Sequence, residues 1–358
     1  MKMVIFSDVH LDASTAGLAR MEDVYDSIDE IVRYAVTSEA DVLAFLGDCC
    51  DPDSLEVHRA VTMIGGRFAD ARADGVRVLA IPGNHDVVED GYNSNVLSAL
   101  AATGTIEQAT IPHVWNVGAY RVGALPYTNR MSNYDPRAAA SRMNSCDMVV
   151  GHLDLPGAQL GSETIDMARG RALEWPIKEL DQWAAPNALL VGGHYHKHQQ
   201  VGRVHICGAP DRFTFGEADN IPGFLEVNLQ TKSVKHIALQ QTKHIATMAL
   251  AEVKALADAK KGQSRQALGP DLILRIVAPD SADAREVEDA VNRAGGCARY
   301  VVQTEKQYDR AARQLAPEEI DVVNVDRIVR EFAASWPAAE LRPAVQAEVE
   351  TTLDQVRD

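Results

Sequence analysis

Short apolar runs that end in polar residues alternate with amphipathic segments along the first part of the chain. The runs predict buried strands at Lys2–Phe6, Ala40–Leu46, Val76–Ile81, Met148–Val150, Ala188–Val191 and Val204–Cys207. Apolar residues at helical spacing predict helices at Met21–Val36, at Ser54–Ala73 with Ser54 as N-cap, and near Asn95–Ala102. Strands joined by helices indicate a layered α/β domain.

The pattern after Gly216 predicts a smaller unit followed by a helical tail. The expected elements are strands Gly223–Val227 and Ser233–Ala238, a helix His244–Ala259, a linker Lys260–Pro270, a βαβ-like unit of Leu272–Val277, Ser281–Ala294 and Cys297–Thr304, and tail helices Pro317–Ala334 and Ala338–Val356. We therefore expect a main domain over residues 1–240, a helical linker over 241–270, a small domain over 271–312 and a helical segment over 313–358.

Composition excludes several classes of protein. The chain has 358 residues, of which 46% are hydrophobic and 24% charged, as in a soluble globular protein with a sizeable core. No run approaches the roughly 20 apolar residues of a membrane span, and the apolar run Met3–Phe6 is too short for a signal peptide. Five cysteines, an odd number without a CxxC pair, disfavour a disulfide framework and a thiolate zinc site. These features predict a cytoplasmic location.

The formal charge of −16 is not typical of a protein that passively coats nucleic acid. It is compatible with an enzyme that collects divalent cations. Residues 231–265 form a local exception, with six lysines and one arginine against two acids, a net charge of +5. This stretch is either a phosphate-contacting surface or an ordinary solvated face.

Five polar clusters follow the predicted strands. They are Asp8-Val9-His10, Gly47-Asp48-Cys49-Cys50-Asp51, Gly83-Asn84-His85-Asp86, Gly151-His152 and Gly193-His194-Tyr195-His196. Residues two apart in extended chain point the same way, so one short segment can supply two ligands to one metal centre. A mixture of carboxylate, imidazole and amide oxygen suits Mn, Fe or Zn better than Ca.

Each cluster alone could be a turn or an exposed polar strand, but five of them after five apolar strands favour a shared metal centre. Seven candidate ligands are too many for one ion and sufficient for two ions that share a bridging carboxylate. They are Asp8, His10, Asp48, Asn84, His152, His194 and His196. Two ions roughly 3.5–4 Å apart can activate a water and stabilise both oxygens of a phosphoryl displacement. His85 adjoins a ligand, is surplus to the ligand count, and is a candidate proton donor.

Together the five clusters resemble the motifs of the calcineurin-like metallophosphoesterases. The resemblance implies an α/β (α+β) fold, a four-layer β-sandwich flanked by helices. It implies two divalent ions, with Mn²⁺ expected first and Mg²⁺, Fe²⁺ or Zn²⁺ as alternatives. By position, one ion would be held by Asp8, His10, Asp48 and His196, and the other by Asp48, Asn84, His152 and His194, with Asp48 bridging. His85 would contact the phosphate and protonate the leaving oxygen.

Within this superfamily the chain resembles SbcD, the nuclease subunit of SbcCD complexes. Pro52 and Asp86 depart from the Gly-Asp-x-x-Asp-Arg-Gly and Gly-Asn-His-Glu motifs of protein phosphatases. Asp8-Val9-His10-Leu11, Gly151-His152 and the stretch Cys207–Glu217 followed by Gly223-Phe224-Leu225 are similar to SbcD segments. This resemblance implies a nuclease domain over 1–240, a small α/β capping domain over 271–312 and a C-terminal partner-binding segment over 313–358. The implied partners are DNA and an SbcC-like SMC-type coiled-coil ATPase, and a homodimer stays open.

Two other functions are kept as alternatives. One is a stand-alone phosphodiesterase for a small nucleotide or lipid-linked substrate, which has less need of a linker, cap and tail. The other is a catalytically inactive scaffold, against which the full ligand set argues. The tail helices could also pack on the chain itself instead of binding a partner. Bulk acidity departs from a DNA enzyme, and Asp51 stands where some relatives of this nuclease class have histidine.

Overall fold

The structure is a computed structural model that describes residues 1–88, 94–127, 142–152, 154–155, 157–159, 187–258 and 268–308. The chain divides into two compact units, one formed by Met1–Val277 with Ala282–Val302 and the other by Ala278–Ser281 with Gln303–Asp358. The expected tail helices Pro317–Ala334 and Ala338–Val356 lie outside the described residues. The division into four segments expected from the sequence stays a prediction.

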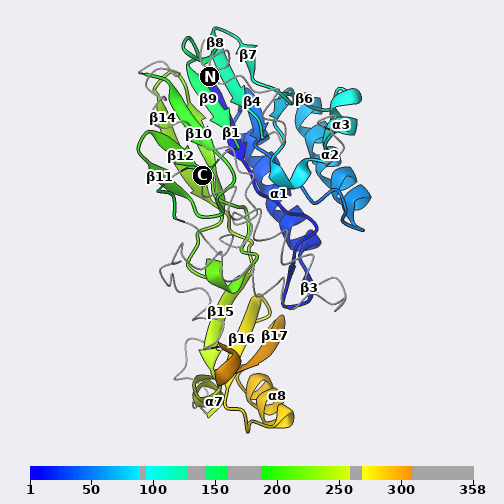
Figure 1. The fold of residues 1–358 in the computed structure, drawn as a ribbon, viewed down its shortest axis with the longest axis vertical. Helices are drawn as coiled ribbons and strands as arrows, with labels where there is room; N and C mark the ends of the chain where they lie inside the picture. The colour runs from blue at the N-terminus through cyan, green and yellow to red at the C-terminus, as the bar shows by residue number, and fades with distance from the viewer. Residues whose placement is uncertain are drawn as a thin grey trace, which may run out of the picture. The chain divides into compact units, whose positions relative to one another are not determined.

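Two six-stranded sheets form the body of the first unit (Figure 1). The first has the order β14-β13-β1-β4-β5-β6, with strands Ser233–Ala238, Gly223–Asn228, Lys2–Phe6, Val42–Phe45, Arg77–Ala80 and Glu107–Gln108. The second has the order β11-β12-β10-β9-β8-β7, with strands Gln199–Val201, Val204–Ile206, Leu189–Gly192, Met148–Gly151, Tyr120–Leu125 and His113–Val117. Strands β1, β4, β5 and β6 are parallel in the first sheet, as are β12, β10, β9 and β8 in the second.

The central strands read as continuous apolar runs because both of their faces are buried. In β1, Met3 and Ile5 pack between the two sheets, whereas Val4 and Phe6 face the helices. Strands β4 and β5 alternate in the same way. The core between the sheets therefore forms one layer of side chains, and the core beneath the helices forms another. The two sheets are held face to face as a sandwich.

Three helices follow strands of the first sheet: α1 (Met21–Thr37), α2 (Val57–Ala73) and α3 (Ser98–Ala102). Buried residues of α1 and α2 join the core on the outer face of this sheet. The predicted start of α2 at Ser54 is wrong, because the N-cap residue of this helix is Glu56. The Ser54 hydroxyl instead accepts the backbone N–H of Glu56 within a turn. The expected mixed α/β architecture of sheets flanked by helices is confirmed.

A separate three-stranded sheet is built from β15 (His244–Ala249), β16 (Leu272–Ala278) and β17 (Arg299–Thr304), with helices α7 (Leu250–Asp258) and α8 (Ala284–Arg293). The helix expected over His244–Ala259 is wrong in its first six residues, which form β15. These residues pair in parallel with β16, Ile245 opposite Ile273. Strand pairing overrides the helical preference of an alanine-rich sequence here.

All five cysteines are free thiols. Among the residues that the structure describes, none of the helices has the length and apolar character needed to cross a bilayer.

Candidate metal centre

The five polar clusters lie at the carboxyl ends of parallel strands in both sheets. Strands β1, β4 and β5 lead into the first three clusters, and β9 and β10 lead into the last two. Parallel strands end at the same edge of a sheet, and the two packed sheets bring their edges together. The structure thus places all seven predicted ligands in one region.

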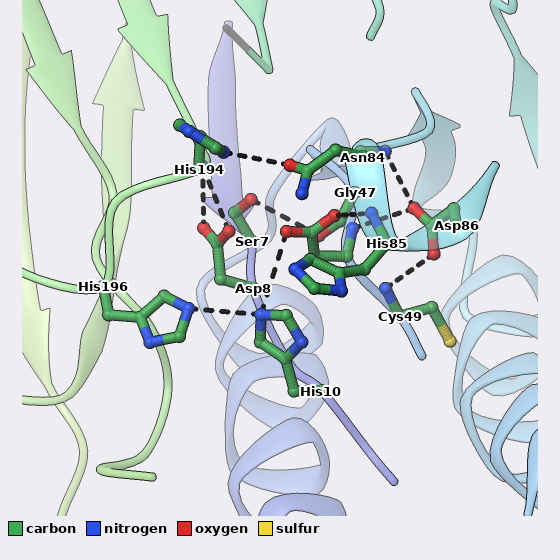
Figure 2. Close-up of polar contacts among 12 residues, drawn as sticks. Ser7, Asp8, His10, Gly47, Cys49, Asn84, His85, Asp86, His194 and His196 are labelled. Carbon is green, nitrogen blue, oxygen red and sulfur yellow. Dashed lines mark hydrogen bonds and ion pairs between the residues drawn. The ribbon is translucent and has the colours of Figure 1, made fainter. Parts of the chain in front are cut away.

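The first group of donors consists of Asp8, His10 and His196, each with one ligand atom within 4.8 Å of the others. Figure 2 shows the rings of His10 and His196 facing each other, with their Nε2 atoms 3.1 Å apart. Asp8 is fully buried and its carboxylate oxygens accept the backbone N–H of His194 at 3.0 and 3.1 Å. Burial raises the pKa of Asp8 and lowers the pKa of His10 to about 3, because burial favours the uncharged form of each side chain.

The second group consists of Asp48, His152 and His194, again with ligand atoms within 4.8 Å. Asn84 belongs with them, because its Oδ1 lies 3.0 Å from His152 Nε2 and 3.0 Å from His194 Nδ1. Figure 2 shows the Asn84 amide oxygen directed at the His194 ring. Two imidazoles, one carboxylate and one amide oxygen form a donor set that suits a borderline divalent ion.

Asp48 lies between the two groups. Its Oδ2 is 3.3 Å from His152 Nε2 and 3.7 Å from His10 Nε2. Burial opposes its negative charge, but His152, His85 and His10 outweigh burial and hold the pKa of Asp48 well below its usual range. A buried, ionised carboxylate in contact with both donor groups has the position that a bridging ligand requires.

In three of the four candidate ligand histidines, the ring nitrogen that points away from the centre lies beside an oxygen atom. His152 Nδ1 lies 2.7 Å from the carbonyl of Leu46, and His194 Nε2 lies 2.7 Å from Asp154 Oδ1. His196 Nδ1 lies 3.3 Å from Glu217 Oε1. These oxygens only accept, so the nitrogen that faces each one carries a proton, and the other nitrogen of each ring faces the centre. The residues therefore fit two divalent ions.

The carboxylates of Asp154 and Glu217 were missed by the sequence reasoning. Asp154 stands two residues after His152, and Glu217 closes the Phe-Gly-Glu stretch that the sequence marks only as a family likeness. Nothing in the sequence pattern of either residue indicates a histidine partner. Glu217 is fully buried; burial opposes its charge, but hydrogen bonds from His196, Phe213 and Thr214 lower its pKa.

The backbone at the centre adopts conformations that are rare for non-glycine residues. Asp8, His10, Asp48 and His194 have φ values of 59°, 40°, 60° and 84°. Such conformations cost roughly 1–3 kcal/mol each and persist where the surroundings impose them. Backbone hydrogen bonds stabilise two of these conformations, because Asp8 N donates to Gly47 O at 2.9 Å and His10 N donates to Asp48 O at 3.1 Å.

Gly83 allows the second and third clusters to approach closely. A methyl group added there would overlap Asp48 Oδ1 and crowd the ring of His152. Any side chain at this position would therefore displace the central carboxylate.

Asp86 fixes the loops that carry Asp48 and Asn84. Its Oδ2 accepts the N–H groups of Asp48 and Gly83, each at 2.8 Å, and its Oδ1 accepts the N–H of Cys49 at 2.7 Å (Figure 2). Burial and the charge of Asp48 raise the pKa of Asp86 to about 7, whereas the N–H partners favour its charged form. Asp86 acts through the backbone and is not among the metal donors.

His85 is placed next to the centre without being one of the grouped donors. Its backbone N–H donates to Asp48 Oδ1 at 2.9 Å, and its ring Nδ1 lies 2.7 Å from Asp51 Oδ1. This hydrogen bond is the main reason that the pKa of Asp51 is lowered. Because an ionised carboxylate only accepts, Nδ1 is the donor, and Nε2 is the atom that can exchange a proton with a substrate. Asp51, whose role the sequence left open, is thus the partner of His85.

Residues 1–203 match the family model of the calcineurin-like phosphoesterases. The chain belongs to the calcineurin-like phosphoesterase family. The match covers more than half of the chain and includes all five clusters. With the two donor groups, it makes the chain a metal-dependent phosphoesterase, a hydrolase that acts on ester bonds.

The solved structures that are similar to this phosphoesterase share little sequence identity with it. A protein of Thermus thermophilus is 11% identical, with 67% of this chain and 99% of that chain covered and a TM-score of 0.41. A dimetal phosphatase from Danio rerio is 11% identical, with 63% of this chain and 91% of that chain covered and a TM-score of 0.43. No curated protein matches the chain. Likeness at this level carries no argument about the substrate.

The basic stretch over 231–265 is largely neutralised within the part that the structure describes. Lys235 pairs with Glu226, Lys243 with Asp271, and Lys254 with Glu286. These pairs favour the solvated-face interpretation of the stretch over a phosphate-contacting one.

Proposed function

We propose that this phosphoesterase is a DNA nuclease subunit that hydrolyses phosphodiester bonds at DNA ends with two divalent ions, Mn²⁺ first among them. The observation that carries the proposal is the position of Asp48, whose carboxylate contacts both donor groups while it accepts the backbone N–H of His85. One buried carboxylate thus joins the two metal donor groups to a candidate proton donor. This arrangement fits phosphoryl displacement, which needs charge neutralisation and an acid for the leaving oxygen.

The residues of this chain have separable roles in such a reaction. The seven ligands would hold the ions, which supply Lewis acidity and lower the pKa of a coordinated water when bound. Asp51 keeps the proton of His85 on Nδ1 and orients the ring. The Nε2 atom of His85, when protonated, can then donate to the leaving oxygen of the substrate. Asp8 and Asp48 add the negative charge that retains two cations in one buried site.

DNA is favoured as the substrate by the likeness of the chain to SbcD. That likeness rests on the Asp8–Leu11 motif and on the stretch Cys207–Glu217. The last residue of this stretch, Glu217, contacts the candidate ligand His196, so the stretch is part of the site. The competing proposal is a stand-alone phosphodiesterase for a small nucleotide or a lipid-linked substrate. Its support is the net charge of −16 and the neutralised lysines described above.

The substrate is tested with purified enzyme and Mn²⁺ on linear double-stranded DNA, bis-p-nitrophenyl phosphate and cyclic nucleotides. We expect degradation of linear DNA and slower hydrolysis of the small diester. Asp48→Asn, purified in parallel, is the control for contaminating nucleases and should be inactive on both. Rapid turnover of cyclic nucleotides without attack on DNA would support the stand-alone enzyme and end the nuclease proposal.

The partner proposed for this subunit is an SMC-like coiled-coil ATPase that binds residues 313–358. This proposal rests on the resemblance and on the amphipathic pattern of the segment. A chain that ends at Arg313 should hydrolyse the small diester normally but fail to co-purify with the co-expressed ATPase. Co-purification of the shortened chain with the ATPase at full yield would contradict the proposed role of residues 313–358. A lower melting temperature of the shortened chain would show that the segment packs on the enzyme itself.

A further inference from the structure

Each group of donors includes one histidine that is held by a carboxylate from outside the ligand set. Glu217 holds His196 of the first group, and Asp154 holds His194 of the second. The two carboxylates come from different segments of the chain, and the histidines that they contact belong to different groups. The third supported histidine, His152, has the neutral carbonyl of Leu46 behind it.

Residues outside the ligand set hold Glu217 in place. Its side chain has no exposed surface. Its Oε2 accepts the backbone N–H of Phe213 at 2.7 Å, and its Oε1 accepts the hydroxyl of Thr214 at 3.0 Å. The 3-10 turn Phe215–Glu217 therefore presents a charged, oriented acceptor to Nδ1 of His196. The opposite nitrogen, Nε2, points at His10 (Figure 2).

Asp154 has the corresponding position behind His194. Its side chain is nearly buried, and its Oδ1 is 2.7 Å from Nε2 of the ring. The hydroxyl of Tyr195 lies 3.5 Å from the same oxygen. The opposite nitrogen of the ring, Nδ1, faces the Asn84 amide oxygen. His194 and His196 thus present different nitrogens to the centre, each selected by its own carboxylate.

We propose that Glu217 and Asp154 are positioning residues that set the affinities of the two metal sites separately. Glu217 acts on the site of Asp8, His10 and His196, and Asp154 on the site of Asn84, His152 and His194. The inference rests on the proposed two-ion centre and adds to it a means of loading the two ions independently. A carboxylate behind a ligating imidazole fixes its tautomer and makes the ligand more basic, and its loss typically weakens metal binding 10–100-fold.

The test measures Mn²⁺ binding to the full chain by calorimetry and by electron paramagnetic resonance, without any substrate. The variants are Glu217→Gln and Asp154→Asn, which keep the size of each side chain and remove its charge. Each should weaken one of two binding events about 10–100-fold, leave the other unchanged, and reduce the spin-coupled two-ion signal at limiting Mn²⁺.

Two single-site backgrounds assign each carboxylate to its ion. In His196→Ala, which lacks a ligand of the first site, Asp154→Asn should weaken the remaining ion and Glu217→Gln should have no further effect. In His194→Ala the two outcomes should be exchanged. Weaker binding of the remaining ion caused by Glu217→Gln in His196→Ala, or by Asp154→Asn in His194→Ala, would contradict separate control. A residue that acts on one ion has no effect on binding once the site of that ion is lost.

Asp211→Asn is the matched control, since Asp211 is a fully buried carboxylate that bonds Arg20 and no histidine. It should lower the melting temperature and leave both Mn²⁺ affinities unchanged. If Glu217→Gln does not fold, Glu217→Asp draws the carboxylate back from His196 and should give the same selective loss. Unchanged affinities in both carboxylate variants, with two ions in the wild type, would overturn this inference alone. Fewer than two ions in the wild type would overturn the proposed centre itself.

Discussion

Asp48 accepts the backbone N–H of His85 on Oδ1 at 2.9 Å, and its other oxygen faces His10 and His152. A single buried carboxylate therefore contacts both the metal donor groups and the residue that is the candidate proton donor. Loss of its charge should affect metal binding and catalysis together, whereas changes at His85 should affect catalysis alone.

His85→Ala should keep both metal ions and lose about 10²–10⁴-fold in kcat, the usual contribution of a general acid. Its ring is not in either donor group, so the ligands are unaffected. Elemental analysis of the Mn²⁺-loaded variant gives the ion content, and hydrolysis of bis-p-nitrophenyl phosphate gives the rate. A parallel loss of metal and rate would mean that His85 is a ligand instead of an acid.

Asp51→Ala should lower kcat about 10-fold, because one partly exposed charge-assisted hydrogen bond to His85 is lost. The same substitution in the His85→Ala background should have almost no further effect, since the two side chains act as one unit. Steady-state kinetics of the four proteins in this cycle measures the coupling. Full additivity would show that Asp51 acts independently of His85.

Gly83→Ala should reduce Mn²⁺ affinity and activity together, because the added methyl group overlaps Asp48 Oδ1. Gly66→Ala in helix α2 is the matched control, as nothing lies within 4 Å of the added methyl group. The control should be active and more stable by up to about 1 kcal/mol, the preference of a helix for alanine over glycine. Equal metal affinity in the two variants would contradict the close approach described at Gly83.

Asp86→Ala should lower the free energy of unfolding by about 3 kcal/mol or more, because three buried N–H groups lose their acceptor. Urea denaturation in the presence of EDTA measures this loss without a contribution from metal binding. Asp29→Ala removes a partly exposed carboxylate that pairs with Arg33 and Arg67, and it should cost less than about 1 kcal/mol. Equal costs for the two variants would contradict the structural role of Asp86.

Much of the fold was predictable because its central strands are buried on both faces. Such strands, β1 and β4 among them, read as apolar runs, and the polar residues that end each run mark one edge of a sheet. The hairpin β7–β8 was missed, since Tyr120–Leu125 includes Arg121 and Gly123 and shows no clear period. The sequence of β15 predicts a helix, because the pairing of this strand with β16 is a long-range property that no local pattern records.

The candidate ligands were predictable for a different reason. Imidazole, carboxylate and amide groups follow successive strands, so residue type and position selected seven candidates that the structure brings into one region, and their binding of metal stays a prediction. The supporting carboxylates were not predictable, because Asp154 and Glu217 are ordinary acids in the sequence and acquire their roles from contact with a histidine. The same holds for Asp51 and Asp86, which have partners 34 to 38 residues away along the chain.

The most direct test of the two-ion centre is the metal content of Asp48→Asn beside the wild type. Both proteins are loaded with Mn²⁺, desalted and analysed for metal per chain, with circular dichroism to show that both are folded. The wild type should hold two ions, and Asp48→Asn should lose much of its metal and essentially all hydrolysis, because both sites share this carboxylate. Two ions per chain in folded Asp48→Asn would contradict the bridging role of Asp48.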